Sequence, residues 1–210
     1  MDTGWQRIAC CTYGTFVVYH PIFALPPIIF SFAQQKISNI MSNYSNLRGH
    51  KEVYQTLDML GIKYSYHEHP PAPTVEEASK YWAGIESAHC KNLFFRNHKG
   101  NKHYLVIFDY RETLNIRDLE QRLNQGKLSF ASPKRMMKYL GLEPGSVSPF
   151  GLLHDVQNHV HLFIDKNLAE AAHISFHPNL NTASLVISQS DFRKYLEHIG
   201  NSYEFIELYG

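Results

Sequence analysis

The apolar positions that follow residue 47 recur with helical spacing. Val53, Leu57 and Leu60 are three or four residues apart, which places them on one face of a helix. Gly61 follows at the position where helix C-termini commonly carry glycine. The pattern therefore predicts an amphipathic helix over residues 47–60.

The rest of the chain alternates between short apolar runs and further segments with helical spacing. Apolar or β-rich runs bounded by turn residues predict strands over residues 62–67, 92–97, 104–109, 160–164, 174–176, 183–187 and 203–206. Helical spacing and terminal signals predict helices over residues 75–82, 115–123, 133–141 and 191–198. Helices and strands are thus interspersed along the sequence.

Two of these helices carry explicit end signals. Thr74 is followed three residues later by Glu77, which is the spacing of a capping box. Ser132 precedes a helix that has Pro133 at its first position and Gly141 at its end. We therefore expect Thr74 and Ser132 to cap their helices.

A glycine-containing loop at residues 98–101 joins two apolar runs and predicts a β-hairpin. This prediction places Lys91 at the start of the first hairpin strand. Because hairpins are frequent and helices lie between strands, the sequence predicts an α/β (α+β) fold. Its mixed, mostly antiparallel sheet should be flanked by helices.

Composition limits the chain to one main domain. With 210 residues, 24.3 kDa and 44% hydrophobic residues, it can bury one good core and carry a short extension. Charged residues make up 19% and sum to a net charge of +1, so any RNA contact requires a local basic patch. Cys10, Cys11 and Cys90 form neither a C-x-x-C pair nor an even disulfide set, which favours a reducing, cytoplasmic location.

Residues 1–46 differ from the remainder and are predicted to form an N-terminal extension outside the domain at 47–210. The segment 16–32 is apolar over about the length of a secretory h-region. Pro26 and Pro27 would break a spanning helix near its middle, so no membrane partner is expected. Membrane association through this segment stays open as an alternative.

Three separated motifs carry the candidate chemistry. Lys91-Asn92-Leu93-Phe94 places a cation beside an apolar strand. Residues 145–152, Gly-Ser-Val-Ser-Pro-Phe-Gly-Leu, form a glycine-framed turn whose backbone amides are expected to be free to face a ligand. Residues 176–179, Phe-His-Pro-Asn, set an imidazole before a proline and an asparagine.

In this order and at these separations, the motifs resemble the YbaK/prolyl-tRNA-synthetase-associated domain family, most closely its free-standing ProX/PrdX branch. The likeness covers roughly residues 47–208 and includes the stretches 64–77, 99–109 and 129–133. Members of this family are hydrolases that deacylate mischarged tRNA, typically Ala-tRNA(Pro) in this branch and Cys-tRNA(Pro) in the YbaK branch. The resemblance implies a curved, mixed, mostly antiparallel sheet with flanking helices.

The resemblance also implies roles for individual residues. It implies Lys91 and His177 as catalytic residues, with the Lys91 cation holding the phosphate or carbonyl region of the terminal nucleotide. It implies a substrate pocket to which six further residues belong: Asn92, Gly145, Ser146, Ser148, Gly151 and Phe176.

The implied substrate makes the acceptor end of a mischarged tRNA(Pro) the expected partner, and prolyl-tRNA synthetase a further one. The helix over residues 133–141 supplies the best local basic patch, and Lys134, Arg135 and Lys138 are the expected tRNA contacts. Lys134 and Lys138 are four residues apart and share a helix face.

The implied reaction requires no cofactor and no metal. An aminoacyl ester is already activated, so positioning and charge stabilisation suffice. The pairs His67-x-His69 and His159-x-His161 fall short of the three or four ligands of a zinc site.

Three other side chains near the motifs are expected to be structural. Cys90 has no activating histidine at a motif spacing and is expected to be a small buried residue. Tyr81 and Trp82 are expected to be core aromatics rather than base-stacking platforms. Two alternatives remain open for the function: a deacylase of Cys-tRNA(Pro) or of another mischarged tRNA, and a catalytically silent module that binds tRNA or a synthetase.

Overall fold

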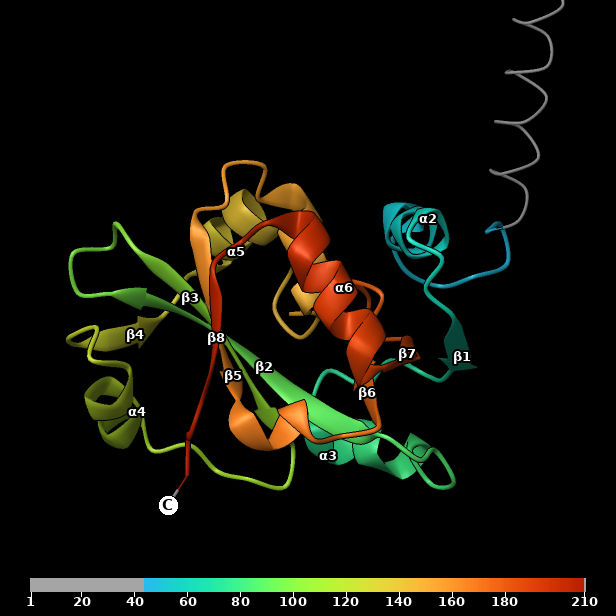
Figure 1. The fold of residues 1–210 in the computed structure, drawn as a ribbon, viewed down its shortest axis with the longest axis horizontal. Helices are drawn as coiled ribbons and strands as arrows, with labels where there is room; N and C mark the ends of the chain where they lie inside the picture. Colours follow the sequence, from blue (N-terminus) through green and yellow to red (C-terminus); the bar gives the residue numbers. More distant parts are fainter. Residues whose placement is uncertain (1–43, 210) are drawn as a thin grey trace, which may run out of the picture. The chain divides into compact units, whose positions relative to one another are not determined.

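The computed structural model describes residues 44–209 (Figure 1). A compact unit spans Tyr44–Gly210. Tyr44 is buried and stacks on Tyr54 with ring centroids 5.8 Å apart, so the packed unit begins three residues before the predicted boundary at residue 47. The predicted extension otherwise lies outside the described residues, as does its apolar segment 16–32.

Helices and strands alternate along the described chain. The α-helices are α2 (Lys51–Met59), α3 (Val75–Ala78), α4 (Ile116–Leu123), α5 (Pro133–Leu140) and α6 (Gln189–Ile199). The 3₁₀-helices are η1 (Ser79–Tyr81), η2 (Pro149–His154) and η3 (Lys166–Ala169). The strands are β1 (Tyr64–Glu68), β2 (Ala88–Asn97), β3 (His103–Asp109), β4 (Leu128–Phe130), β5 (Val160–Asp165), β6 (His173–Phe176), β7 (Ala183–Ser188) and β8 (Tyr203–Ile206). None of the helices within residues 44–209 combines the length and the apolar character that crossing a bilayer requires.

The strands form an eight-stranded sheet in the order β1-β7-β6-β2-β3-β5-β8, and β4 pairs with β2 beside this path. The pairs β1–β7, β6–β7, β2–β3 and β2–β4 are antiparallel. The pairs β2–β6, β3–β5 and β5–β8 are parallel. The predicted fold class, an α/β (α+β) domain with a mixed, mostly antiparallel sheet flanked by helices, is therefore confirmed.

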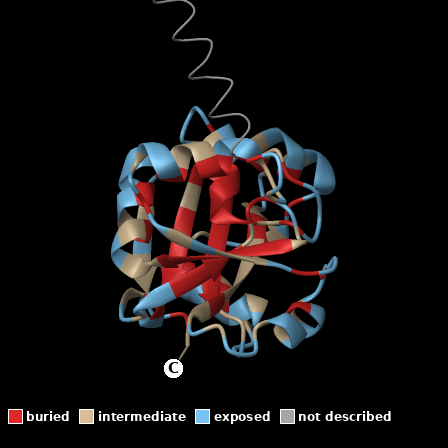
Figure 2. Ribbon diagram, turned by 90° about the vertical axis from the view of Figure 1, so that its right-hand side faces the viewer, coloured by how far each residue is buried: buried red, intermediate tan, exposed pale blue. Residues whose placement is uncertain are grey.

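Strand β2 supplies side chains to two separate parts of the core. Successive side chains of a strand point to opposite faces. Phe94 belongs to a cluster that also takes buried residues from α2, α5 and α6, whereas Phe95 belongs to a cluster with buried residues of α4. Burying a phenylalanine side chain stabilises a fold by about 1.5–3 kcal/mol. Figure 2 shows the result, with buried central strands surrounded by helices whose outer sides are exposed.

The predicted start of the hairpin was wrong. Strand β2 begins at Ala88, so Lys91 is its fourth residue and not its first. Ala88 and His89 pair with β6, which lies more than eighty residues later in the chain. This long-range pairing, which no local pattern shows, extends the strand beyond its apolar run.

Three other elements differ in detail from the prediction. The segment 75–82 forms the short helix α3 followed by the 3₁₀-helix η1, and Thr74 caps it by accepting a hydrogen bond from Glu77 N. Ser132 occupies the N-cap position of α5 but its side chain makes no capping hydrogen bond, so that prediction was wrong. Strand β4 was not predicted, because a three-residue strand has too little alternation to detect.

Candidate active site

Strand β2 lacks a partner along the middle of one edge. On the other edge it pairs with β3 over Cys90–Arg96. On this edge it pairs with β6 at its first two residues and with β4 only from Phe95 onward. Between these two pairings, the edge of β2 around Asn92 therefore faces a gap in the sheet.

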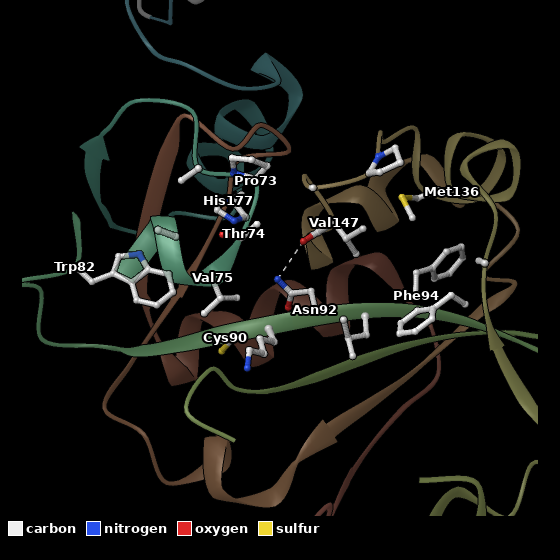
Figure 3. A pocket seen from close by; sticks show the side chains of 18 residues that line it. Pro73, Thr74, Val75, Trp82, Cys90, Asn92, Phe94, Met136, Val147 and His177 are labelled. Carbon is white, nitrogen blue, oxygen red and sulfur yellow. Dashed lines mark hydrogen bonds between the residues drawn. The ribbon is translucent and has the colours of Figure 1, made fainter. Parts of the chain in front are cut away.

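A cavity of about 400 Å³ lies at this gap (Figure 3). One side is the strand itself, from Cys90 to Phe94. The other walls come from four regions, namely the segment around α3, strand β4 with α5, the turn before η2, and the residue after β6. Their lining residues are Ala72, Pro73, Thr74, Val75, Ala78, Trp82, Phe130, Ala131, Met136, Pro144, Gly145, Val147 and His177. A mainly apolar lining with a few polar groups is typical of a small-ligand site.

Asn92 connects β2 to the turn before η2. Its Nδ2 donates to the carbonyl of Val147 over 3.1 Å (Figure 3). This bond fixes the amide plane, and Oδ1 is buried without a hydrogen-bond partner among the described residues. Asn92 lines the cavity, as expected from the motif, and its binding role stays a prediction.

Ser148 connects the same turn to the residue after β6. Its fully buried hydroxyl donates to the carbonyl of His177 over 2.7 Å and accepts from Phe150 N over 3.2 Å. Ser148 does not line the cavity. Its position indicates that it holds the turn against His177 instead of contacting a ligand.

The backbone amides of the turn are less free than the sequence suggested. Ser146 N donates to the carbonyl of Glu143, and Gly151 N donates to that of Ser148. The segment from Pro149 onward forms the 3₁₀-helix η2, so the prediction of a turn over residues 145–152 was wrong for its second half.

The two glycines of this motif occupy different places. Gly145 has φ +85 and lines the cavity, where an added Cβ would lie 3.5 Å from Cβ of Pro73. At Gly151 an added Cβ would lie 2.6 Å from Cδ1 of Leu142 and 3.0 Å from the carbonyl oxygen of Leu140. Gly151 therefore permits close packing of η2 against α5 and does not face the cavity.

His177 presents a neutral imidazole to the cavity. Its Nδ1 lies 3.2 Å from the carbonyl of Ala183, so Nδ1 carries the hydrogen and Nε2 is the unprotonated nitrogen. Burial lowers the pKa of His177, with a smaller contribution in the same direction from the nearby ring of His69. The preceding residue, Phe176, packs its ring against Phe192 in the core and does not line the cavity.

Lys91 is one of the residues of β2 that line the cavity, but its side chain leaves the strand on the face opposite to Asn92. Adjacent side chains alternate, so Lys91 and Asn92 leave the strand in opposite directions. The Lys91 ammonium donates to the carbonyl of Glu112 over 3.1 Å at an exposed position. A hydrogen bond of a charged group contributes about 1.5–3 kcal/mol, and a phosphate, itself charged, can replace this carbonyl as the acceptor of the ammonium.

The basic residues of α5 divide into two kinds. Lys134 and Lys138 are exposed. Arg135 points inward, where its Nη1 donates to the carbonyl of Gly100 over 2.7 Å and contacts Nε2 of His103 at 2.9 Å. The structure therefore places Arg135 as an anchor of α5, and it does not bring all three predicted tRNA contacts to one surface.

His103 is the buried centre of this anchor. Since Arg135 can only donate, His103 Nε2 accepts, and Nδ1 donates to Nε2 of His159 over 2.9 Å. Burial is the largest cause that lowers the pKa of His103 to about 4, followed by the neighbouring His159, Arg135 and Lys138.

Several lining residues were not assigned to the pocket from the sequence. Trp82 lines the cavity and stacks on His89, with ring centroids 4.1 Å apart and planes at 6°. Tyr81 is 41% exposed and stacks on His69. Neither is a core aromatic, so that expectation was wrong. Met136 of α5 also lines the cavity. The signal in the sequence that could have indicated this is that Met136 lies close to residues 129–133, a stretch that carries the family resemblance.

The remaining predictions on side-chain chemistry concern cysteine and metals. Cys90 lines the cavity, and burial raises the pKa of its thiol, which leaves it a poor nucleophile. Within residues 44–209, no three histidine, cysteine or acidic side chains are arranged to hold a metal ion. The predicted histidine pairs are engaged otherwise, since His69 contacts Ser184 and His161 contacts Glu204.

Comparison with known proteins agrees with this geometry. The model of the aminoacyl-tRNA editing domain family matches residues 69–195. The prolyl-tRNA editing protein ProX of Acetoanaerobium sticklandii is 41% identical over 156 residues, which cover 74% of this chain and 95% of that protein. The prolyl-tRNA synthetase associated domain-containing protein 1 of Bos taurus is 31% identical over 151 residues, covering 70% of this chain and 88% of that protein. The crystal structure of hypothetical protein APE2540 covers 73% of this chain and 97% of its own with a TM-score of 0.57 at 21% identity, which shows a shared fold.

Fold, site and relatives together define an aminoacyl-tRNA deacylase, a hydrolase that acts on an ester bond. The chain belongs to the aminoacyl-tRNA editing domain family.

Proposed function

We propose that this protein is a trans-editing deacylase that hydrolyses Ala-tRNA(Pro) and spares Pro-tRNA(Pro). The observation that carries the proposal is a small, mainly apolar cavity beside a neutral imidazole, in a chain 41% identical to a prolyl-tRNA editing protein. The name of that relative supports tRNA(Pro) as the substrate class. The preference for alanine follows from selection by size.

Selection by size needs apolar walls close to the aminoacyl side chain. Val75, Phe94 and Met136 supply such walls around the gap in the sheet. Apolar pockets discriminate by about 1–3 kcal/mol per methylene, and the proline ring adds two carbons to the alanine methyl. Cysteine is close to alanine in size, so Cys-tRNA(Pro) is the second candidate substrate.

The proposed roles follow the positions of the side chains. Lys91 binds the terminal phosphate after leaving the carbonyl of Glu112. Nε2 of His177 accepts a hydrogen from the attacking water or from the ribose 2′-hydroxyl. Asn92 and Gly145 form part of the wall of the aminoacyl site.

Four further residues support the site without contacting the substrate, and two lysines contact the tRNA. Ser146, Ser148, Gly151 and Phe176 keep the surrounding backbone in place without lining the cavity. Lys134 and Lys138 contact the acceptor stem through its phosphates. Prolyl-tRNA synthetase as a partner and a cytoplasmic location stay predictions.

The test is single-turnover deacylation of Ala-tRNA(Pro) and Pro-tRNA(Pro) by the wild type, Lys91→Ala and the control Lys63→Ala, which replaces an exposed lysine that does not line the cavity. We expect hydrolysis of Ala-tRNA(Pro) only, lost in Lys91→Ala and kept in Lys63→Ala. Equal rates on both substrates would contradict the selection by size. A well-folded wild type without hydrolytic activity would favour the silent binding module.

A further inference from the structure

The gap in the sheet has a consequence for the backbone of β2. In an antiparallel ladder, alternate residues direct their N–H and C=O groups to opposite edges. Asn97 N donates to the carbonyl of Lys102, the residue before β3, over 3.1 Å. The backbone N–H and C=O groups of the odd-numbered residues of β2 therefore point toward β3. The backbone N–H and C=O groups of the even-numbered residues point toward the other edge. Phe94 confirms this direction, because its carbonyl accepts a hydrogen bond from Ala131 N over 2.9 Å.

Asn92 lies two residues before Phe94, so its N–H and C=O point to the same edge. Pairing with β6 ends at His89 and pairing with β4 begins at Phe95, so no strand lies opposite Asn92 there. Neither backbone group has a hydrogen-bond partner among the described residues. Asn92 lines the cavity and is partly buried. Because sheltered peptide groups are nearly always paired, this one points to a ligand.

We propose that the aminoacyl group of the substrate docks on Asn92 as a one-residue β-strand, an inference that rests on the proposed function. An aminoacyl ester carries the two groups of a strand residue, an N–H donor in its α-ammonium and an acceptor in its carbonyl. In a hydrogen-bonded antiparallel pair, two residues exchange both N–H···O=C bonds. The α-ammonium donates to the carbonyl of Asn92, and the ester carbonyl oxygen accepts from Asn92 N–H.

This docking places the substrate side chain on a defined face. Residues directly opposite each other in an antiparallel pair have their side chains on the same face. The substrate side chain therefore lies on the face that carries the side chains of Asn92 and Phe94, where Val147 also lines the cavity. This is the apolar part of the pocket, which suits a methyl group.

The Asn92 N–H is then a catalytic group. Water adds through its oxygen to the ester carbonyl carbon, and the carbonyl electron pair moves onto the oxygen that Asn92 N–H binds. The intermediate collapses by breaking the bond from carbon to the ribose oxygen, and a proton originally on the water ends on that oxygen. The products are the free amino acid and the tRNA hydroxyl. A backbone N–H that binds the developing oxyanion is worth about 100- to 1000-fold in rate.

The first experiment compares Asn92→Pro with Asn92→Ala in single-turnover deacylation of Ala-tRNA(Pro). Both variants lose the side chain, but only proline also removes the N–H, and that N–H makes no ladder bond whose loss would open the sheet. We expect Asn92→Pro to react at least about 100-fold more slowly than Asn92→Ala. Equal rates would overturn the inference and leave the proposed function intact, whereas an inactive wild type would overturn both.

A second experiment does not depend on turnover or on the folding of a variant. Amide hydrogen exchange is measured on the wild type with and without 3′-deoxy-3′-alanylamido-adenosine, whose amide bond resists hydrolysis. Leu93 is the internal control, because its N–H lies on the ladder with β3. We expect Asn92 N–H to exchange faster than Leu93 N–H in the free protein and to become protected when the analogue binds. Equal protection of the two amides in the free protein, or no change at Asn92 on binding, would overturn the inference.

Discussion

Replacing Ser148 with alanine tests whether this residue holds the pocket wall or contacts the substrate. The hydroxyl is fully buried, donates to the carbonyl of His177 over 2.7 Å and accepts from Phe150 N over 3.2 Å. Losing a capping hydroxyl costs about 0.5–2 kcal/mol, and a buried group left unpaired costs about 1–3 kcal/mol. Because both losses occur together, we expect Ser148→Ala to destabilise the fold by about 1.5–5 kcal/mol.

Thermal unfolding followed by circular dichroism measures this loss. A domain of this size loses about 2–4 °C in Tm per kcal/mol, so the expected decrease is about 3–20 °C. The matched control is Ser146→Ala, in the same turn, since the Ser146 side chain is buried but makes no hydrogen bond within the described residues. Its Tm should change by less than a third of the Ser148→Ala shift.

Deacylation by Ser148→Ala at a temperature where the variant is folded completes the test. If Ser148 acts by holding the turn, hydrolysis decreases only as far as the position of His177 changes, and most of the activity remains. An unchanged Tm together with abolished hydrolysis would refute this reasoning, because it would show a direct contact with the substrate. A shift as large in Ser146→Ala would also refute it.

Four further predictions follow from the structure. Lys134→Ala with Lys138→Ala should weaken tRNA binding and reduce the slope of log affinity against log salt by about 1.4–1.8, as for two lost phosphate contacts; an unchanged slope would exclude this patch. Gly151→Ala should cost about 1–3 kcal/mol in urea unfolding, since its Cβ would lie 2.6 Å from a leucine methyl carbon, and an unchanged midpoint would contradict that packing. The pKa of His103 is lowered from 6.5 to about 4, so its contribution to stability is fully present above about pH 6.5 and is lost as the pH falls through about 4. Urea unfolding of the wild type should therefore show that the free energy of unfolding decreases by at most about 1.4 kcal/mol per pH unit between about pH 6.5 and pH 4. If His103→Asn shows the same decrease with pH, the decrease is caused by other groups. A chain of residues 41–210 should keep its deacylation activity, and a folded but inactive 41–210 protein would show that the preceding residues contribute.

Local signals in the sequence determined most element types and several of their ends. Thr74 and Glu77 meet across one helical turn, so their spacing alone predicted the cap that the structure shows. Gly141 ends α5 with φ +65, a conformation that glycine adopts without strain. Apolar runs such as 104–109 became the buried strand β3, because a run buried on both faces needs no alternation.

The sequence also located the candidate site, because its motifs stand at the separations of a known family. It could not assign the part that each residue plays. Ser148 contacts a carbonyl 29 residues later in the chain, and Asn92 contacts one 55 residues later, so neither partner is visible in a local pattern. Arg135 and Lys134 are neighbours of the same charge, yet only packing against His103 turns the former inward.

The sequence by itself thus determined the type and order of most elements and the family, since these depend on residue periodicity, on end signals and on motif order. Only the tertiary structure decided where β2 loses its partner strand. That gap arises because β6 and β4, which lie far apart in the chain, pair with opposite ends of the same edge. The unpaired backbone at Asn92 and the cavity beside it are products of those long-range pairings, which the hydrogen bonds of the assembled sheet select.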